Sequence, residues 1–131
     1  GKGILLTVAD ENNLKVELSN GRITESWSSD PHTLQKGKAQ HVTVIIDGGP
    51  NIITFVVNGR LCDGGKHRQY GWGRFSEKLA NINGSSNASI ASDLNGQLLS
   101  LRIYDRYLLT SEAISNYRAG KALHLDGFES P

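Results

Sequence analysis

The sequence predicts an all-β fold, a two-sheet antiparallel β-sandwich with one short helix near its C-terminus. Its 131 residues include 15 glycines, with Asn and Ser frequent beside them, so many turns must join short elements. Several segments alternate apolar and polar residues with the period of a half-buried strand, and one segment has helical spacing. This length is typical of one domain, so we expect residues 1–131 to form a single domain.

The N-terminal part predicts three strands, at residues 4–8, 14–18 and 22–28. Turn formers at 10–13 separate the first two strands. An Asn-Gly pair at 20–21 predicts a two-residue hairpin before the third strand, because both residue types adopt positive φ readily. We therefore expect an antiparallel meander here.

Residues 41–59 predict a second antiparallel hairpin. Apolar residues occupy both alternating sets of positions at 42–46, which indicates a strand with a central position in the sandwich. Turn formers at 47–50 lead into a β-branched and aromatic segment at 52–57. A second Asn-Gly pair, at 58–59, turns the chain once more.

The C-terminal part predicts a last strand at 98–104. Alternation along this strand should turn Ile103 inward and place Arg102 and Tyr104 on the other face, while Asp105 could pair with a neighbouring arginine. We interpret these residues as fold-specifying and not ligand-binding. Replacing Tyr104 should therefore lower stability without changing ligand selectivity.

A helix is predicted at 108–120. Thr110 can cap its first turn, Glu112 is favourable near its N-terminus, and Gly120 suits the left-handed position at its C-terminus. This is the one helix that we expect.

Bulk charge and hydropathy exclude two kinds of partner. Lys and Arg number 14 against 13 Asp and Glu, so the net charge of +1 creates no field that would attract nucleic acid. Apolar residues make up 37% of the chain and are scattered. No stretch approaches the ~20 apolar residues that span a bilayer. We expect neither a nucleic-acid partner nor a membrane span.

Two segments carry a family resemblance. The first comprises residues 41–47 and 53–59, and the second, which is more specific, comprises residues 94–106 and 109–114. Both resemble the LamG-like jelly rolls of the concanavalin A-like lectin/glucanase superfamily. The resemblance implies a domain that binds carbohydrate, or sometimes protein, often as an appendage of a secreted enzyme. Complete members carry further N-terminal strands, so we expect the C-terminal part of a larger protein or a compact variant.

Catalysis is not expected. Glycoside-cleaving relatives on this fold use carboxylates spaced Glu-x-Asp-x-Glu on one strand, so that alternate residues enter one cleft, and this spacing does not occur. The Gly-x-Ser-x-Gly elbow of serine hydrolases is also missing from the sequence. We therefore predict that the domain is not an enzyme.

The predicted ligand-binding loop lies at 67–75. Sugars present apolar C–H faces that stack on aromatic rings, and hydroxyls that need planar or charged hydrogen-bond partners. The alternative is that the aromatic side chains of this loop cover an open end of the sandwich. The predicted ligand-binding residues are His67, Arg68, Gln69, Tyr70, Trp72 and Arg74.

Calcium is the one cofactor with a candidate site. Asp47 and Asp63 each border turn residues whose carbonyls could complete an oxygen shell, and the resemblance also implies a structural calcium. The alternative is that both are plain turn formers, the commoner role of Asp beside Gly. The single cysteine, Cys62, excludes an intramolecular disulfide and should be buried.

Two functions remain in competition. The first is a non-catalytic, lectin-like module that binds a glycan or polysaccharide in a secreted, periplasmic or cell-surface protein. The arginines of the predicted loop favour acidic glycans. The second is a structural or protein-interaction domain that packs on an adjacent glycoside-processing catalytic domain, in which case the same loop is an interface.

Overall fold

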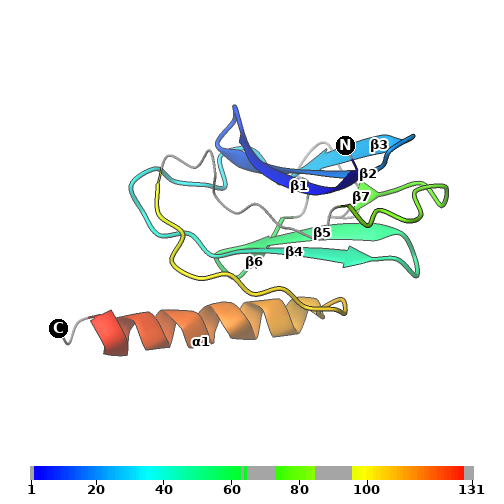
Figure 1. The fold of residues 1–131 in the computed structure, drawn as a ribbon. Coiled ribbons are helices and arrows are strands. Elements are labelled where there is room, and N and C mark those ends of the chain that lie inside the picture. Colours follow the sequence, from blue (N-terminus) through cyan, green and yellow to red (C-terminus); the bar gives the residue numbers. More distant parts are fainter. Residues whose placement is uncertain (1, 63, 65–72, 85–95, 129–131) are drawn as a thin grey trace.

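Two antiparallel sheets lie one above the other, and a helix lies below the lower sheet (Figure 1). The computed structural model describes residues 2–62, 64, 73–84 and 96–128, with the backbone alone for 121–128. The elements in chain order are β1 (Lys2–Ala9), β2 (Asn13–Asn20), β3 (Thr24–Ser28), β4 (Val42–Asp47), β5 (Ile52–Val57), β6 (Arg60–Leu61), β7 (Gly73–Arg74) and α1 (Thr110–Phe128). This architecture confirms the predicted fold class.

Sheet A contains β1, β2 and β3 in that order. The turn between β2 and β3 is longer than the predicted two-residue hairpin, because Ser19 pairs with Thr24. The side-chain oxygen of Asn20 accepts hydrogen bonds from the backbone N–H groups of Arg22 and Ile23, at 2.9 and 2.8 Å. This side-chain bonding replaces the backbone geometry that the Asn-Gly pair predicted.

Sheet B contains β4, β5 and β6 in that order, and β7 also pairs with β5. Asn58 and Gly59 both have positive φ, 50° and 73°, as predicted for the turn after β5. Among the described strands, β4 ends the order of sheet B. Both of its faces are covered, since one faces sheet A and the other faces the start of α1.

The main core lies between the sheets. Its buried residues come from β2 and β5 and from the segments after β6 and β7, and they are Val16, Leu18, Ile53, Phe55, Val57, Cys62 and Leu79. Cys62 is buried, as predicted. A second cluster joins the opposite face of sheet B to α1 and consists of Ile45, Val56, Leu108 and Ala113. The alternation of β5 thus supplies both clusters.

The helix begins at Thr110 and continues past Gly120 to Phe128. The predicted end at Gly120 is therefore wrong, since a glycine is tolerated inside a helix at a cost of about 1 kcal/mol relative to alanine. Glu112 supports the first turn, because its carboxylate accepts the backbone N–H of Leu109 at 3.1 Å. Arg106 donates two hydrogen bonds to the same carboxylate, at 3.1 and 2.7 Å. No helix in the described part of the chain is long and apolar enough to cross a membrane.

The segment 97–104 is not a strand, so that prediction is wrong. Ile103, expected to face inward, is 80% exposed. Asp105 was expected to pair with a neighbouring arginine. It belongs to neither of the two ion pairs found among the described residues, and Arg106 pairs with Glu112 instead. A strand needs a neighbouring strand for its backbone hydrogen bonds, and none of the described strands pairs with this segment.

Candidate functional site

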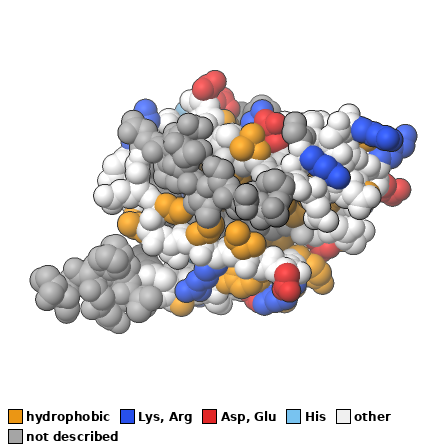
Figure 2. All heavy atoms as spheres, viewed as in Figure 1, with side chains coloured by type: hydrophobic (Ala, Val, Ile, Leu, Met, Phe, Trp, Pro, Cys, Tyr) orange, Lys and Arg blue, Asp and Glu red, His pale blue; other side chains and the backbone are white. Residues whose placement is uncertain are grey.

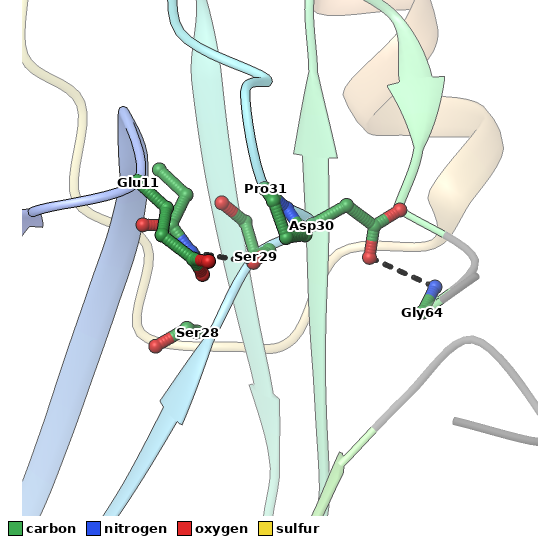
Figure 3. A pocket seen from close by; sticks show the side chains of 7 residues that line it. Glu11, Ser28, Ser29, Asp30, Pro31 and Gly64 are labelled. Carbon is green, nitrogen blue, oxygen red and sulfur yellow. Dashed lines mark hydrogen bonds between the residues drawn. The ribbon is translucent and has the colours of Figure 1, made fainter. Parts of the chain in front are cut away.

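A polar pocket opens at one end of the sandwich, where the β1–β2 turn meets the segment after β3 (Figure 3). Its volume is about 160 Å³. The walls come from three separate parts of the chain and comprise Glu11, Asn13, Ser28, Ser29, Asp30, Pro31 and Gly64. The antiparallel pairing of β1, β2 and β3 brings the first two parts to the same end of sheet A.

Asn13 and Ser29 are the most buried polar residues of this pocket, each with 3% of its surface exposed, and Asn13 has the unusual bonding. Its amide nitrogen donates to the backbone carbonyl of Ser29 at 2.9 Å. Its amide oxygen is buried and has no hydrogen-bond partner among the described residues. A buried acceptor without a partner is costly, so this oxygen is a natural point of attachment for a hydrogen-bond donor from outside.

Asp30 fixes the third wall. One of its carboxylate oxygens accepts the backbone N–H of Gly64 at 2.9 Å, as Figure 3 shows. Nearby, the Ser29 hydroxyl accepts the N–H of Leu14 at 2.9 Å and contacts the Thr33 hydroxyl at 3.1 Å. These bonds tie the segment after β3 both to β2 and to the chain that follows β6.

The chemistry of the pocket is that of an acceptor. Its described lining residues include two carboxylates, those of Glu11 and Asp30, and no Lys, Arg or His. Neither carboxylate belongs to the two ion pairs found among the described residues, which are Lys15–Glu17 and Arg106–Glu112. A ligand here meets negative charge that no basic side chain of the described lining offsets.

The described residues include only 73–75 of the predicted ligand-binding loop. His67, Arg68, Gln69, Tyr70 and Trp72 lie outside the described residues. Arg74 lies in β7 and is exposed. The next residue, Phe75, makes two contacts with the sandwich. Its backbone N–H donates to the carbonyl of Asn51 at 2.9 Å, and its ring packs edge-on against Trp27.

Of the two predicted calcium residues, the structure describes only Asp47, and Asp47 does not line the pocket. Asp63 lies outside the described residues, and Asp47 ends β4 at the β4–β5 turn, at the other end of the sandwich from the β1–β2 turn (Figure 1). Asp47 accepts the N–H of Gly49 at 3.0 Å, which is the bonding of a turn former. The described residues include no group of three or more His, Cys, Asp or Glu that could hold a metal. Among the described residues, Asp47 has no further side-chain ligands with which it could hold calcium. The calcium site stays a prediction.

The strand register places two of the predicted site residues, Asp47 and Arg74, on the same face of sheet B. Ile52 of β5 pairs with Asp47 on one side and with Arg74 on the other. Cross-strand partners share one face of a sheet, so Asp47 and Arg74 flank Ile52 on the same face of sheet B. Sequence reasoning missed the pocket itself, because Asn13, Asp30 and Gly64 form no motif. The one sequence feature that could have indicated this pocket is a polar residue, Asn13, at the start of an apolar strand.

The two antiparallel sheets define the chain as a β-sandwich module, and a pocket opens at one end of it. A family model described as "Concanavalin A-like lectin/glucanases superfamily" matches residues 1–115. The chain therefore belongs to this superfamily, and the predicted family is confirmed.

One solved structure is similar to this chain, a crystal structure of residues 221–444 of an S-layer domain-containing protein from Clostridium thermocellum ATCC 27405. The two sequences are 21% identical, and the TM-score is 0.44. The similarity covers 88% of this chain and 57% of the other, so this chain spans little more than half the length of that one. No curated protein matches the sequence.

Proposed function

We propose that this chain is a non-catalytic carbohydrate-binding module of a secreted or cell-surface protein, and that the pocket at Glu11, Asn13 and Asp30 takes part in binding. The observation that carries this proposal is the buried, unpartnered amide oxygen of Asn13 in a pocket of carboxylate and hydroxyl groups. Sugar hydroxyls are donors that such acceptors recognise. The family to which the chain belongs supports a lectin-like role.

The position of Gly64 links this pocket to the predicted loop. Gly64 is held by Asp30 and lies three residues before His67, the first of the predicted ligand-binding residues. A ligand in the pocket would therefore lie beside the start of the segment that carries Tyr70 and Trp72.

The test is a titration of the purified chain against neutral, acidic and amino-containing oligosaccharides by isothermal calorimetry. Trp72→Ala and Asn13→Ala should each abolish or strongly weaken binding of the glycan that the native chain binds. The melting temperature of Trp72→Ala should stay near that of the native chain, and Trp27→Ala is the contrasting variant, because Trp27 packs against the core. A folded native chain that binds none of the three glycan classes would contradict the proposal.

A second candidate function rests on a different observation. Ile4, Leu6 and Val8 lie opposite Leu18, Val16 and Leu14 on the inner face of sheet A, yet each remains more than half exposed. Leu98, Leu99, Leu101 and Ile103 are also exposed. Figure 2 shows hydrophobic side chains at the surface in the middle and lower parts of the same view.

These apolar side chains favour a module that packs on an adjoining domain. The test is hydrogen exchange of β1 in this chain and in a longer chain from the same gene. Slower exchange of β1 amides in the longer chain would support the packing function, and equal exchange would contradict it. The two functions are compatible in one protein, because the pocket and the inner face of β1 are different surfaces.

A further inference from the structure

We propose that the pocket selects glycans that carry free amino groups, so that a protonated sugar amine lies between Glu11 and Asp30 while a neighbouring hydroxyl donates to Asn13. This inference rests on the proposed carbohydrate-binding function and names its ligand class. It reverses the preference for acidic glycans that the arginines at 68 and 74 predicted, because the described pocket has the opposite charge.

The first step of the argument is charge. Glu11 and Asp30 are the acidic side chains of the described lining, which contains no basic side chain. Neither is neutralised in an ion pair of the described residues. A sugar carboxylate or sulfate in this pocket would be repelled, whereas an ammonium group would be attracted.

The second step is hydrogen-bond direction. One N–H of the Asn13 amide nitrogen donates to the Ser29 carbonyl at 2.9 Å, and the amide oxygen has no hydrogen-bond partner among the described residues. One oxygen of Asp30 accepts from Gly64, and the other has no partner among the described residues. These carboxylate and amide oxygens accept and do not donate, and an ammonium or hydroxyl group satisfies them whereas a carboxylate does not.

The third step is burial. Asn13 is nearly inaccessible, at 3% exposure, while Glu11 is exposed at the rim. A hydrogen bond to the buried amide oxygen fixes the depth of the ligand, and the rim carboxylate supplies attraction that solvent weakens. The carboxylates and the Asn13 amide should respond differently to salt. The contribution of the carboxylates to affinity should fall with added salt, and that of the amide should not.

The experiment compares three oligosaccharides of equal length by isothermal calorimetry at pH 6 and low salt. They are a fully deacetylated glucosamine tetramer, the corresponding N-acetylglucosamine tetramer and a tetragalacturonate. We expect the deacetylated tetramer to bind roughly tenfold more tightly than the acetylated one, since two exposed ion pairs each contribute about twofold to fivefold. The tetragalacturonate should bind most weakly of the three.

Two isosteric variants test the assignment to these carboxylates. Glu11→Gln and Asp30→Asn should each reduce the preference for the deacetylated tetramer by about twofold to fivefold and leave the acetylated tetramer nearly unaffected. The amide in Asp30→Asn keeps an oxygen that can accept the Gly64 N–H, so the wall should persist. Glu77→Gln is the matched control, because Glu77 is exposed and does not line the pocket.

The outcomes separate this inference from the proposed function. Equal affinity for the acetylated and deacetylated tetramers, or a preference that both variants leave unchanged, would overturn the inference while carbohydrate binding stands. Binding that calcium restores and EDTA removes would also overturn it, because the carboxylates would then hold a metal ion. Failure of all three tetramers to bind the folded chain would overturn the proposed function as well.

Discussion

The β4–β5 hairpin and the segment 97–104 have similar sequences and different structures. Both are rich in branched apolar residues, whose side chains would alternate between two faces if each segment formed a strand. Every residue of β4 pairs with one of β5, and the hairpin is covered on one face by sheet A and on the other by the start of α1. The segment 97–104 pairs with no described strand, and its large apolar residues lie exposed.

The difference shows what alternation specifies. It gives a segment the capacity to be a strand, but the strand forms only where a neighbour accepts its backbone hydrogen bonds and a layer covers its apolar face. Phe55 is 1% exposed and Ile103 is 80% exposed, although both occupy positions that alternation turns inward. Tertiary context therefore decides between the two segments.

The largest expected effect is that of Phe55→Ala in the hairpin. Phe55 is among the largest fully buried side chains of the described chain, and its removal leaves a cavity between the sheets. The free energy of unfolding should fall by about 3–5 kcal/mol, measured by urea denaturation. Phe55→Leu should cost less because it fills more of the space. A loss below about 1 kcal/mol for Phe55→Ala would contradict the burial on which the comparison depends.

The next effect is that of Gly59→Ala, at the end of the hairpin. Gly59 has a φ of 73°, and an added Cβ would lie 2.5 Å from Cδ1 of Tyr117 on α1. We expect a loss of about 2 kcal/mol, combining backbone strain with displacement of the Tyr117 ring. Gly37→Ala is the matched control, since Gly37 has a φ of 76° and open space around it. Equal losses in the two variants would contradict a steric role for Tyr117.

Turn chemistry explains how much of the fold the sequence predicts. The turn formers at 10–13 and 47–50 and the pair at 58–59 act locally, so the hairpins that they close were predicted within one or two residues. The end of α1 was not, because Gly120 is compatible with both a helix end and a helix interior. The strand at 98–104 was wrong because its formation depends on a partner that the local sequence does not reveal.

The candidate site was harder to predict than the fold. Asn13, Asp30 and Gly64 are far apart in sequence, and the sheet pairing and the Asp30–Gly64 hydrogen bond bring them together. Local reasoning instead selected the aromatic and basic run at 67–75, because those residues are adjacent in the chain. A pocket made of three separate turns has no sequence signature.

A smaller, pH-dependent effect is expected where the segment after 104 meets α1. Hydrogen bonds from Arg106, followed by that from the Leu109 N–H, lower the pKa of Glu112 to about 2 from 4.5. Its contribution to stability is therefore complete above about pH 4.5 and is lost as the pH falls toward 2. Glu112→Gln should be less stable than the native chain at pH 7, and the difference should shrink between pH 4.5 and 2.

Thermal melts of both proteins by circular dichroism across this range measure the Glu112 contribution. Glu77→Gln is the control, since Glu77 is exposed and has no ion pair among the described residues. A difference between the native chain and Glu112→Gln that stays constant from pH 7 to pH 2 would contradict the charged role of Glu112.

Tyr104→Phe should have a smaller effect. The Asn116 side chain donates to the Tyr104 hydroxyl at 3.3 Å, which joins the end of the exposed segment to α1. Removing the hydroxyl should lower the free energy of unfolding by about 0.5 kcal/mol, because the bond is long and exposed. A double-mutant cycle with Asn116→Ala measures the coupling. An unchanged melting temperature would contradict the fold-specifying role of Tyr104.

The smallest effect belongs to Ile103→Ser, in the segment that the sequence predicts as a strand. Ile103 is 80% exposed, so the substitution should change the free energy of unfolding by less than about 0.5 kcal/mol, measured by urea denaturation. Ile45→Ser is the matched variant in β4, where the same residue type is buried against Val56 and Leu108, and it should cost several-fold more. A loss of about 2 kcal/mol for Ile103→Ser would mean that this segment is covered in the folded protein. Alternation would then have specified a strand in both segments, and the contrast between them would disappear.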